Sequence, residues 1–469
     1  MRRWWLGLVF AVAAAVLWPG TVHAQPFSLA QITDTAGPSN LLPAISANGA
    51  RIVFLSTRDL TPGRPGNADG NTEVFLFDVA TGRFTQITNT VGGNIGGSFF
   101  APVINATGTR IAFVFDRNPT PASTGNADAN DEIYLFDTTT GLISQITNTT
   151  ACSNITPSIN AAGTRIAFAS GCDLTPGQPG NADHNLEIFL VDTTTGQFTQ
   201  ITNTTVGGPL GLGANLSPSI SAAGTRIAFL SDRDLTPGNP GNPDFNGEVF
   251  LFDTTTGQFT QVTRTTGEPF GRFVQPVISG DGTRIAFLSN LDLVPGNPGN
   301  ADGNAEVFLF DTTTAQTRQI TNTTGGFSAI NRLTINATGT RIVFSSDRNL
   351  VSGGPGKEVG NTDLFLFDTT TGSFTQVTNT TGGFNSDPSI SADGTRIAFV
   401  SNRDLTPGRP GNADANFELF VAAPPGVFPQ PVPALSEWAQ IVLIALLLIV
   451  GFSGLARRAS TRMAATRPG

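Results

Sequence analysis

The chain has 469 residues, of which 39% are hydrophobic and 13% are charged, and it contains 35 phenylalanines and 53 glycines. These apolar residues are enough to build a large core, so the composition excludes a disordered chain. Residues 25–436 hold 20 basic and 34 acidic residues, which gives them a net charge near −14. An acidic surface repels phosphate groups, so nucleic acid and anionic lipid are excluded as ligands.

The first 24 residues have the order of a secretory signal peptide. Arg2 and Arg3 precede an apolar stretch of about a dozen residues. The stretch ends in a small-x-small cleavage site at residues 22–24, which read Val-His-Ala. We therefore expect cleavage after Ala24 and export of the rest of the chain.

A unit of 55 to 61 residues then occurs seven times within residues 25–423. Its short runs are rich in Val, Ile, Phe and Thr and are bounded by Gly, Pro and Asn, which is typical of β-strands. Seven copies of this length predict an all-β fold, a seven-bladed β-propeller of four-stranded blades, with a solenoid as the alternative. Each copy is marked by an element of the type Thr-Arg-Ile, whose arginines are Arg51, Arg110, Arg165, Arg226, Arg284, Arg341 and Arg396.

The two ends of the repeat array complement each other. Residues 27–33 read FSLAQIT and match a fourth strand that has no repeat before it. The seventh copy ends at residues 418–421 with no fourth strand after it. We therefore predict that the N-terminal strand completes the last blade, which removes the exposed edges of an open array.

Repeated charges and a cysteine pair predict contacts within blades. Each repeated arginine should face an aspartate across antiparallel strands, which adds about 0.2–1 kcal/mol. Cys152 and Cys172 flank a hairpin that turns near residues 162–163, and exported proteins keep disulfides, so we predict that the two are bonded. The repeated aspartates are Asp78, Asp137, Asp192, Asp253, Asp311 and Asp368.

The connection between the second and third runs is long and nearly constant, as in DLTPGRPGNADGNTE at residues 59–73. Its spaced oxygen side chains, N-x-D-x-N-x-E, are of the kind that calcium accepts. The alternative is that Asn and Asp satisfy backbone groups in tight turns. The calcium hypothesis places ligands at Asp69, Asn71, Glu73, Asp302, Asn304 and Glu306.

The connections between blades vary most from copy to copy, and we expect them to share a face with the long links. A constant rim with varying inserts is what a binding face requires. An aromatic residue in such an insert can instead be buried between blades, so both interpretations stay open. The candidate ligand-contacting residues are Phe99, Phe100, Phe270, Arg272, Phe273, Phe327, Arg332 and Phe384.

The repeats offer few residues for catalysis. After signal cleavage the chain keeps one histidine, His184, and one tyrosine, Tyr134. His184 lies in a link and is not accompanied by the G-x-S-x-G elbow of a hydrolase. We therefore expect that the protein is not an enzyme and that it has no cofactor unless calcium binds.

The C-terminus carries a second targeting signal. Residues 424–436 form a Pro-rich linker, residues 437–456 a predicted transmembrane helix with an apolar run of about 18 residues, and residues 457–469 a basic tail that should stay cytoplasmic. The sequence VPALSEW resembles the IPTL-CTERM sorting signal of Gram-negative bacteria. This resemblance implies recognition and removal by a sorting enzyme. The matching residues are Pro433, Leu435, Ser436, Glu437 and Trp438.

The runs GTRIAFLSDRDL, EVFLFD and QFTQIT resemble the WD-repeat-like propeller repeats of TolB and related periplasmic proteins, over about residues 27–421. The separate N-terminal domain of TolB has no counterpart here, so its partners are not implied. We expect a module that binds an envelope protein or a glycan, with the propeller in the periplasm and the C-terminal helix in the inner membrane, and possible release to the cell surface after processing. A structural surface protein and a propeller hydrolase are the alternatives.

Overall fold

The computed structural model describes residues 27–426 except for 38–39, 64–65, 91–99, 122, 124, 178–179, 206–214, 237, 239–240, 267–273, 295, 297–298, 325–331, 352–360 and 407–410. The expected signal peptide, sorting motif, transmembrane helix and basic tail lie outside these residues. Within them, no helix has the length and apolar character needed to cross a membrane.

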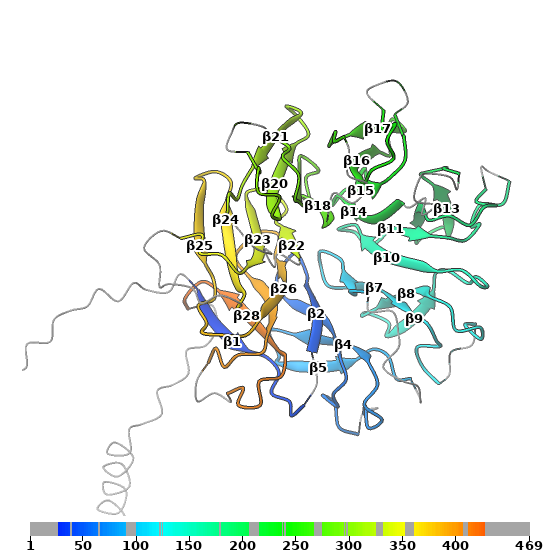
Figure 1. The fold of residues 1–469 in the computed structure, drawn as a ribbon. Coiled ribbons are helices and arrows are strands. Elements are labelled where there is room, and N and C mark those ends of the chain that lie inside the picture. The colour runs from blue at the N-terminus through cyan, green and yellow to red at the C-terminus, as the bar shows by residue number, and fades with distance from the viewer. Residues whose placement is uncertain are drawn as a thin grey trace, which may run out of the picture. The chain divides into compact units, whose positions relative to one another are not determined.

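The described strands form seven four-stranded antiparallel sheets, the blades of a β-propeller (Figure 1). The predicted all-β propeller is therefore confirmed. Blade 1 consists of β2 (Asn40–Ile45), β3 (Arg51–Ser56), β4 (Glu73–Asp78) and β5 (Arg83–Gln86). Blades 2 to 4 comprise β6 (Val103–Ile104), β7 (Arg110–Phe115), β8 (Glu132–Asp137), β9 (Leu142–Gln145), β10 (Asn154–Ile159), β11 (Arg165–Ser170), β12 (Glu187–Asp192), β13 (Gln197–Gln200), β14 (Asn215–Ile220), β15 (Arg226–Ser231), β16 (Glu248–Asp253) and β17 (Gln258–Gln261).

The remaining blades follow the same order, from the first strand near the centre of the ring to the fourth at its rim (Figure 1). Blades 5 to 7 comprise β18 (Val274–Ile278), β19 (Arg284–Ser289), β20 (Glu306–Asp311), β21 (Gln316–Gln319), β22 (Leu333–Ile335), β23 (Arg341–Ser346), β24 (Asp363–Asp368), β25 (Ser373–Gln376), β26 (Asn385–Ile390), β27 (Ile397–Ser401) and β28 (Glu418–Ala423), completed by β1 (Ser28–Gln31).

The N-terminal strand closes the ring, as predicted. β1 pairs antiparallel with β28, from Ser28 opposite Ala423 to Gln31 opposite Phe420, and Figure 1 shows the two strands side by side. The ladder continues for one more bond, because the Ile32 N–H donates to the Leu419 carbonyl at 2.8 Å. The seventh blade is therefore held by residues from both ends of the repeat array.

The middle two strands of each blade are buried on both faces, because neighbouring blades cover them. Phe54 on β3 and Phe75 on β4 are both fully buried, and their ring centroids lie 6.0 Å apart. Apolar side chains of adjoining blades then pack together, as Val53 of blade 1 does with Ile111 and Phe113 of blade 2. The continuous apolar runs of the sequence thus reflect burial between blades rather than one central core.

The first strand of most blades contains a bulge. The pairing register shifts between Leu41 and Ala44 of β2, and the same shift occurs in β10, β14, β18 and β26. The bulged residue has a positive φ, 53° at Leu42 and 52° at Asp387. A bulge bends its strand and increases the twist.

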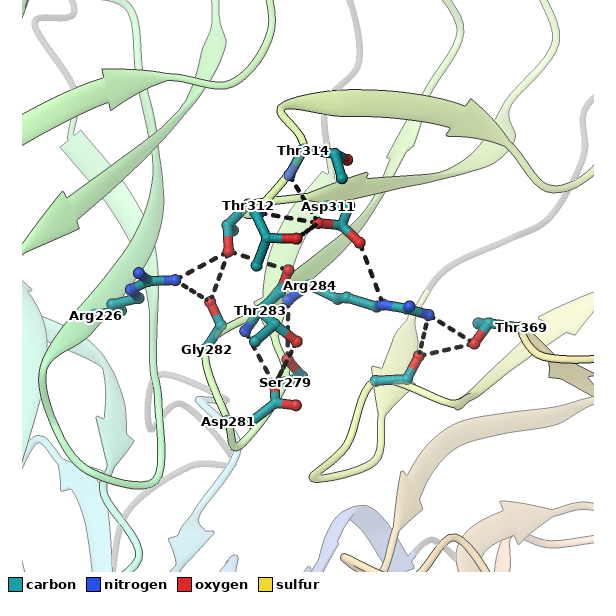
Figure 2. A network of polar contacts seen from close by, with 12 residues as sticks. Arg226, Ser279, Asp281, Gly282, Thr283, Arg284, Asp311, Thr312, Thr314 and Thr369 are labelled. Atoms are coloured by element: carbon teal, nitrogen blue, oxygen red, sulfur yellow. Dashed lines mark hydrogen bonds and ion pairs between the residues drawn. The ribbon is translucent and has the colours of Figure 1, made fainter.

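The repeated arginines have a second role that the sequence did not reveal. Their cross-strand pairing with aspartate is confirmed, and Arg284 Nε lies 3.8 Å from Asp311 Oδ2. The same arginine also donates from Nη1 to Thr369 Oγ1 of the next blade at 2.9 Å, as Figure 2 shows. Arginines in five other blades donate to the turn glycine carbonyl of the following blade; one of the five is Arg396 of blade 7, which donates to the Gly49 carbonyl of blade 1 at 2.7 Å.

A ring of backbone hydrogen bonds runs parallel to these arginine contacts. The Ala161 N–H donates to Ala222 O, Ala222 N–H to Gly280 O, and Ala392 N–H of blade 7 to Ala47 O of blade 1. With the bonds between the other blades, each blade is linked to the next around the whole circle. The turns between first and second strands therefore act as a closed belt, independent of the seam at β1.

Candidate functional site

The two faces of the ring are built differently. The face we call the turn face carries the turns between the first and second strands and between the third and fourth, for example residues 46–50 and 79–82. The opposite face, the link face, carries the long links between the second and third strands and the connections between blades. The expectation that links and inter-blade connections share a face is thus met, since Asn89 N–H donates to Pro119 O of the next link at 2.8 Å.

On the turn face, the repeated polar groups bind one another. Asp137 Oδ1 accepts from the Thr139 backbone N–H at 2.8 Å and from its hydroxyl at 2.5 Å. The hydroxyl bond from Thr139 is the main reason that the pKa of Asp137 lies below its usual value. The equivalent aspartates of other blades have the same partners, so the turn carboxylates serve local structure.

On the link face, a buried carboxylate starts the third strand of each blade. Glu187 is fully buried, and its Oε1 accepts from the Thr204 backbone N–H at 2.5 Å and from the Thr204 hydroxyl at 2.6 Å. The other oxygen accepts from Asn215 Nδ2 of the next blade at 3.0 Å. Burial raises the pKa of Glu187, as it does that of Glu73 and Glu248.

The asparagine in this contact clasps one blade to the next. Asn154 donates to Glu132 at 3.1 Å, Asn385 to Asp363 at 3.2 Å, and Asn40 of blade 1 to Glu418 of blade 7 at 3.0 Å. In blades 2, 5 and 6 the chain before the first strand runs through residues outside the described part. In blade 5, Glu306 Oε2 is buried and has no hydrogen-bond partner within the described part of the chain.

Sequence reasoning missed this clasp, although the signal was present. Asparagine recurs three residues before the proline of the first strand, as in Asn40, Asn154, Asn215 and Asn385. Its partner is a glutamate on the preceding blade, so the contact cannot be read within one repeat. At the same spacing before the corresponding prolines of blades 2 and 5, the sequence has Phe99 and Phe273, two of the proposed ligand-contacting residues.

The six residues of the calcium hypothesis fall into three kinds. Glu73 and Glu306 are fully buried and accept hydrogen bonds from threonines, as from Thr90 Oγ1 to Glu73 at 2.7 Å. Asn71 and Asn304 donate their amide nitrogen to a threonine carbonyl and keep a buried Oδ1 without a partner. Asp69 and Asp302 are exposed. Over the described ranges, no group of three or more His, Cys, Asp or Glu side chains is placed to hold a metal.

The candidate ligand-contacting residues also differ from one another in exposure and in contacts. Phe384 is 48% exposed on the link face, and its backbone N–H donates to Asn402 Oδ1 at 2.7 Å. Arg332 Nη1 lies 3.7 Å from Asp387 Oδ1 of the next blade. Phe100 is partly buried against the core between blades 2 and 3. The residues outside the described part are Phe99, Phe270, Arg272, Phe273 and Phe327.

The predicted disulfide between Cys152 and Cys172 is present, with the Cα atoms 5.5 Å apart. Cys172 occupies the position that Arg403 occupies in blade 7, two residues after the second strand. Arg403 Nε donates to the Gly382 carbonyl in the chain just before its own first strand. In blade 3 the disulfide makes the equivalent connection covalently.

His184 lies at the tip of a link, exposed, with a φ of 56°. Its Nδ1 is 3.2 Å from the Gly171 carbonyl. Other tips hold Gly70, Ala129, Phe245 and Ala415, all with positive φ. The histidine is therefore one variant at a structurally constrained position.

In the described part of the chain, grooves lie between neighbouring blades, each lined by the end of one blade's fourth strand and by the link and fourth strand of the next; three of them are described below. The seam groove, about 730 Å³, lies between blades 6 and 7 beside the closing strand β1 and includes Phe27 and Leu29. A groove of about 470 Å³ between blades 1 and 2 includes Tyr134 and the 66% exposed Leu142. A third, of about 450 Å³, lies between blades 5 and 6.

Solved structures share this fold at low sequence identity. An oligogalacturonate lyase from Vibrio parahaemolyticus is 11% identical, over 84% of this chain and 93% of that one, with a TM-score of 0.52. An oligogalacturonate lyase in complex with manganese is 16% identical, over 86% and 95%, also with a TM-score of 0.52. TolB from Acinetobacter baumannii is 19% identical, over 75% and 76%, with a TM-score of 0.40. No family model matches the chain, and no curated protein sequence matches it.

These structures correct the expectation that the protein is not an enzyme. Two proteins that share this fold are oligogalacturonate lyases, so the fold is compatible with an enzyme. The expectation rested on the residues of a hydrolase triad, centred on His184. A lyase breaks its substrate by elimination and needs no such triad, so that reasoning did not cover this class of reaction.

Proposed function

We propose that the protein is an exported binding module that recognises a protein or a glycan at the bacterial cell envelope or surface through the link face. The contrast between the two faces carries the proposal. On the turn face, the repeated arginines and aspartates are engaged in turns and inter-blade contacts. The links of the link face line the grooves between blades, and the residues that line these grooves differ from one junction to the next.

The proposal also includes the route to that location. The signal peptide exports the chain, the C-terminal helix holds it in the inner membrane, and the sorting signal directs its processing. The disulfide between Cys152 and Cys172 supports an oxidising compartment. Intact mass and cell fraction of the native protein test both cleavages: a mature mass that starts at Gln25 and lacks residues after the sorting motif is expected.

Binding is tested with the purified propeller on a glycan array and by cross-linking in the native envelope. A reproducible ligand whose binding is weakened by changes on the link face, such as Phe384→Ala, supports the proposal. Thr139→Ala on the turn face is the matched control and should leave binding unchanged. Ordered self-assembly of the protein without any ligand would favour the alternative of a structural surface protein.

A further inference from the structure

The seam groove differs from the equivalent grooves because its fourth strand comes from the other end of the chain. In six blades the fourth strand follows a tight turn, whose last residue is a glycine in five of them, with φ between 67° and 73°, and Ala315 in the sixth. Strand register puts Phe27 at that position in blade 7. No turn precedes β1 within the blade, so an aromatic residue is accommodated there without strain.

Phe27 and Leu29 give the groove an apolar wall. Both are partly buried against the core cluster between blades 6 and 7, together with Leu405 from the link of blade 7, and all three line the groove. Six-membered sugar rings present apolar C–H faces that stack on an aromatic ring. Such a wall is therefore suited to one face of a saccharide.

The rest of the groove is polar. Asn412 is 6% exposed and lines the groove; its Nδ2 donates to the Asn416 carbonyl at 2.8 Å, while its Oδ1 has no partner in the described part of the chain. The same oxygen has no described partner in the equivalent Asn67, Asn126, Asn181 and Asn242 of other links, so it is a feature of the link itself, and Asn412 contributes polar surface to the groove. Thr381 is exposed on the opposite side, where blade 6 ends.

Two charges of opposite sign line the same groove. Arg403 donates from Nε to the Gly382 carbonyl at 2.5 Å, and Asp404 Oδ1 accepts from the Thr406 backbone N–H at 3.2 Å. The local charge is therefore balanced, while the exported domain as a whole is acidic. This balance favours an uncharged ligand over an anionic one. The groove's 730 Å³ is within the usual range for a small-molecule site.

From this combination we infer that the seam groove is a site for a neutral saccharide, and that binding there stabilises closure of the propeller ring. The inference rests on the proposed recognition function and narrows it to one place and one ligand class. The coupling follows from the architecture. Phe27 and Leu29 belong to the strand that closes the ring, so release of β1 removes one wall of the site. A saccharide that binds only the closed form must then oppose release.

Hydrogen–deuterium exchange of the full chain tests the inference, with maltose, cellobiose and N,N′-diacetylchitobiose as probes. At a concentration ten times its dissociation constant, a probe bound in the groove should slow exchange of the Ser28–Gln31 amides about elevenfold. The acidic disaccharide digalacturonate should bind more weakly. Thr381→Trp, which places a large side chain at the exposed side of the groove, should abolish the effect, whereas Leu142→Trp in the groove between blades 1 and 2 should retain it.

The outcomes test the site and the ligand class separately. Slower exchange at β1 that is lost in Thr381→Trp supports the site. A saccharide that binds without changing exchange at β1, or that binds equally to Thr381→Trp, overturns the seam site but leaves the proposed binding function in place. No effect of any neutral disaccharide, or protection by digalacturonate or a peptide alone, overturns the ligand class. Phe27→Ala is a second test variant. Hydrogen exchange of its β1 amides without ligand shows how far the substitution itself loosens the pairing of β1 with β28.

Discussion

At the scale of single residues, the departures from the repeat show which contacts each position makes. Cys172 stands where blade 7 has Arg403, and Cys152 stands where it has Gly383. The arginine contact and the disulfide both tie the start of a link to the chain before the first strand. The stabilities of variants that exchange one connection for the other can therefore be compared.

Replacing both cysteines by serine should lower the free energy of unfolding by about 3 kcal/mol, because the disulfide closes a loop of about 20 residues in the unfolded chain. The pair Cys152→Gly with Cys172→Arg should lose less, since it restores the arrangement of blade 7. Denaturant unfolding of the three proteins measures both differences. Equal losses in the two variants would contradict the equivalence.

A second residue-scale prediction concerns the strained link tips. Ala129 has a φ of 58°, at the position where blades 1 and 5 have Gly70 and Gly303. A left-handed backbone costs an alanine about 1 kcal/mol, so Ala129→Gly should stabilise the protein by roughly that amount. Ala127, exposed in the same link and without a positive φ, is the control: Ala127→Gly should destabilise it. The prediction fails if both substitutions change the unfolding midpoint in the same direction.

At the scale of elements, the strands and their pairing could be predicted, and the contacts between blades could not. The runs around Arg284 and Glu306 alternate with turn residues at short range, so their pairing follows from local pattern. The closing strand was predictable because residues 27–33 lack a preceding repeat. The asparagine clasp, as between Asn215 and Glu187, depends on how two blades pack, which no pattern within one repeat encodes. The same holds for the seam groove.

The buried glutamates at the start of the third strands give this packing a pH dependence. Burial raises the pKa of Glu187, so its folded pKa lies above its unfolded one. Its contribution to stability is then fully present below the unfolded pKa and is lost as pH rises through the folded pKa. Glu187→Gln removes the titration, so the variant should gain stability relative to the wild-type protein as pH rises from 4 to 7. Denaturant unfolding across that range checks this, and a difference that stays constant would contradict it.

At the scale of the whole molecule, two sets of contacts close the ring: the four-residue seam at β1 and the belt on the turn face. The seam joins strands that are far apart in sequence, whereas the belt joins each blade to its neighbour through a turn. The arginine contacts belong to the belt. The glycine in each of these turns has a positive φ, and a Cβ there would also lie within 2.5 to 3.0 Å of the preceding blade's arginine side chain.

Arg396 isolates the contribution of the belt where the ring closes. Blade 7 has Ala423 in place of the repeated aspartate, so the bond to the Gly49 carbonyl is not accompanied by the cross-strand ion pair found in blades 1, 2, 4 and 5. Arg396→Gln should lower the free energy of unfolding by about 1–2 kcal/mol, the loss of a charged hydrogen bond at a partly exposed site. It should also speed hydrogen exchange at both β1 and β2, because the seam and the belt support the same junction.

Arg226→Gln, between blades 4 and 5, is the matched control. It should lower the free energy of unfolding by at least as much, because it also breaks the ion pair with Asp253, but it should leave hydrogen exchange at β1 unchanged. Faster exchange at β1 in both variants would show that the ring opens as one unit rather than at its seam.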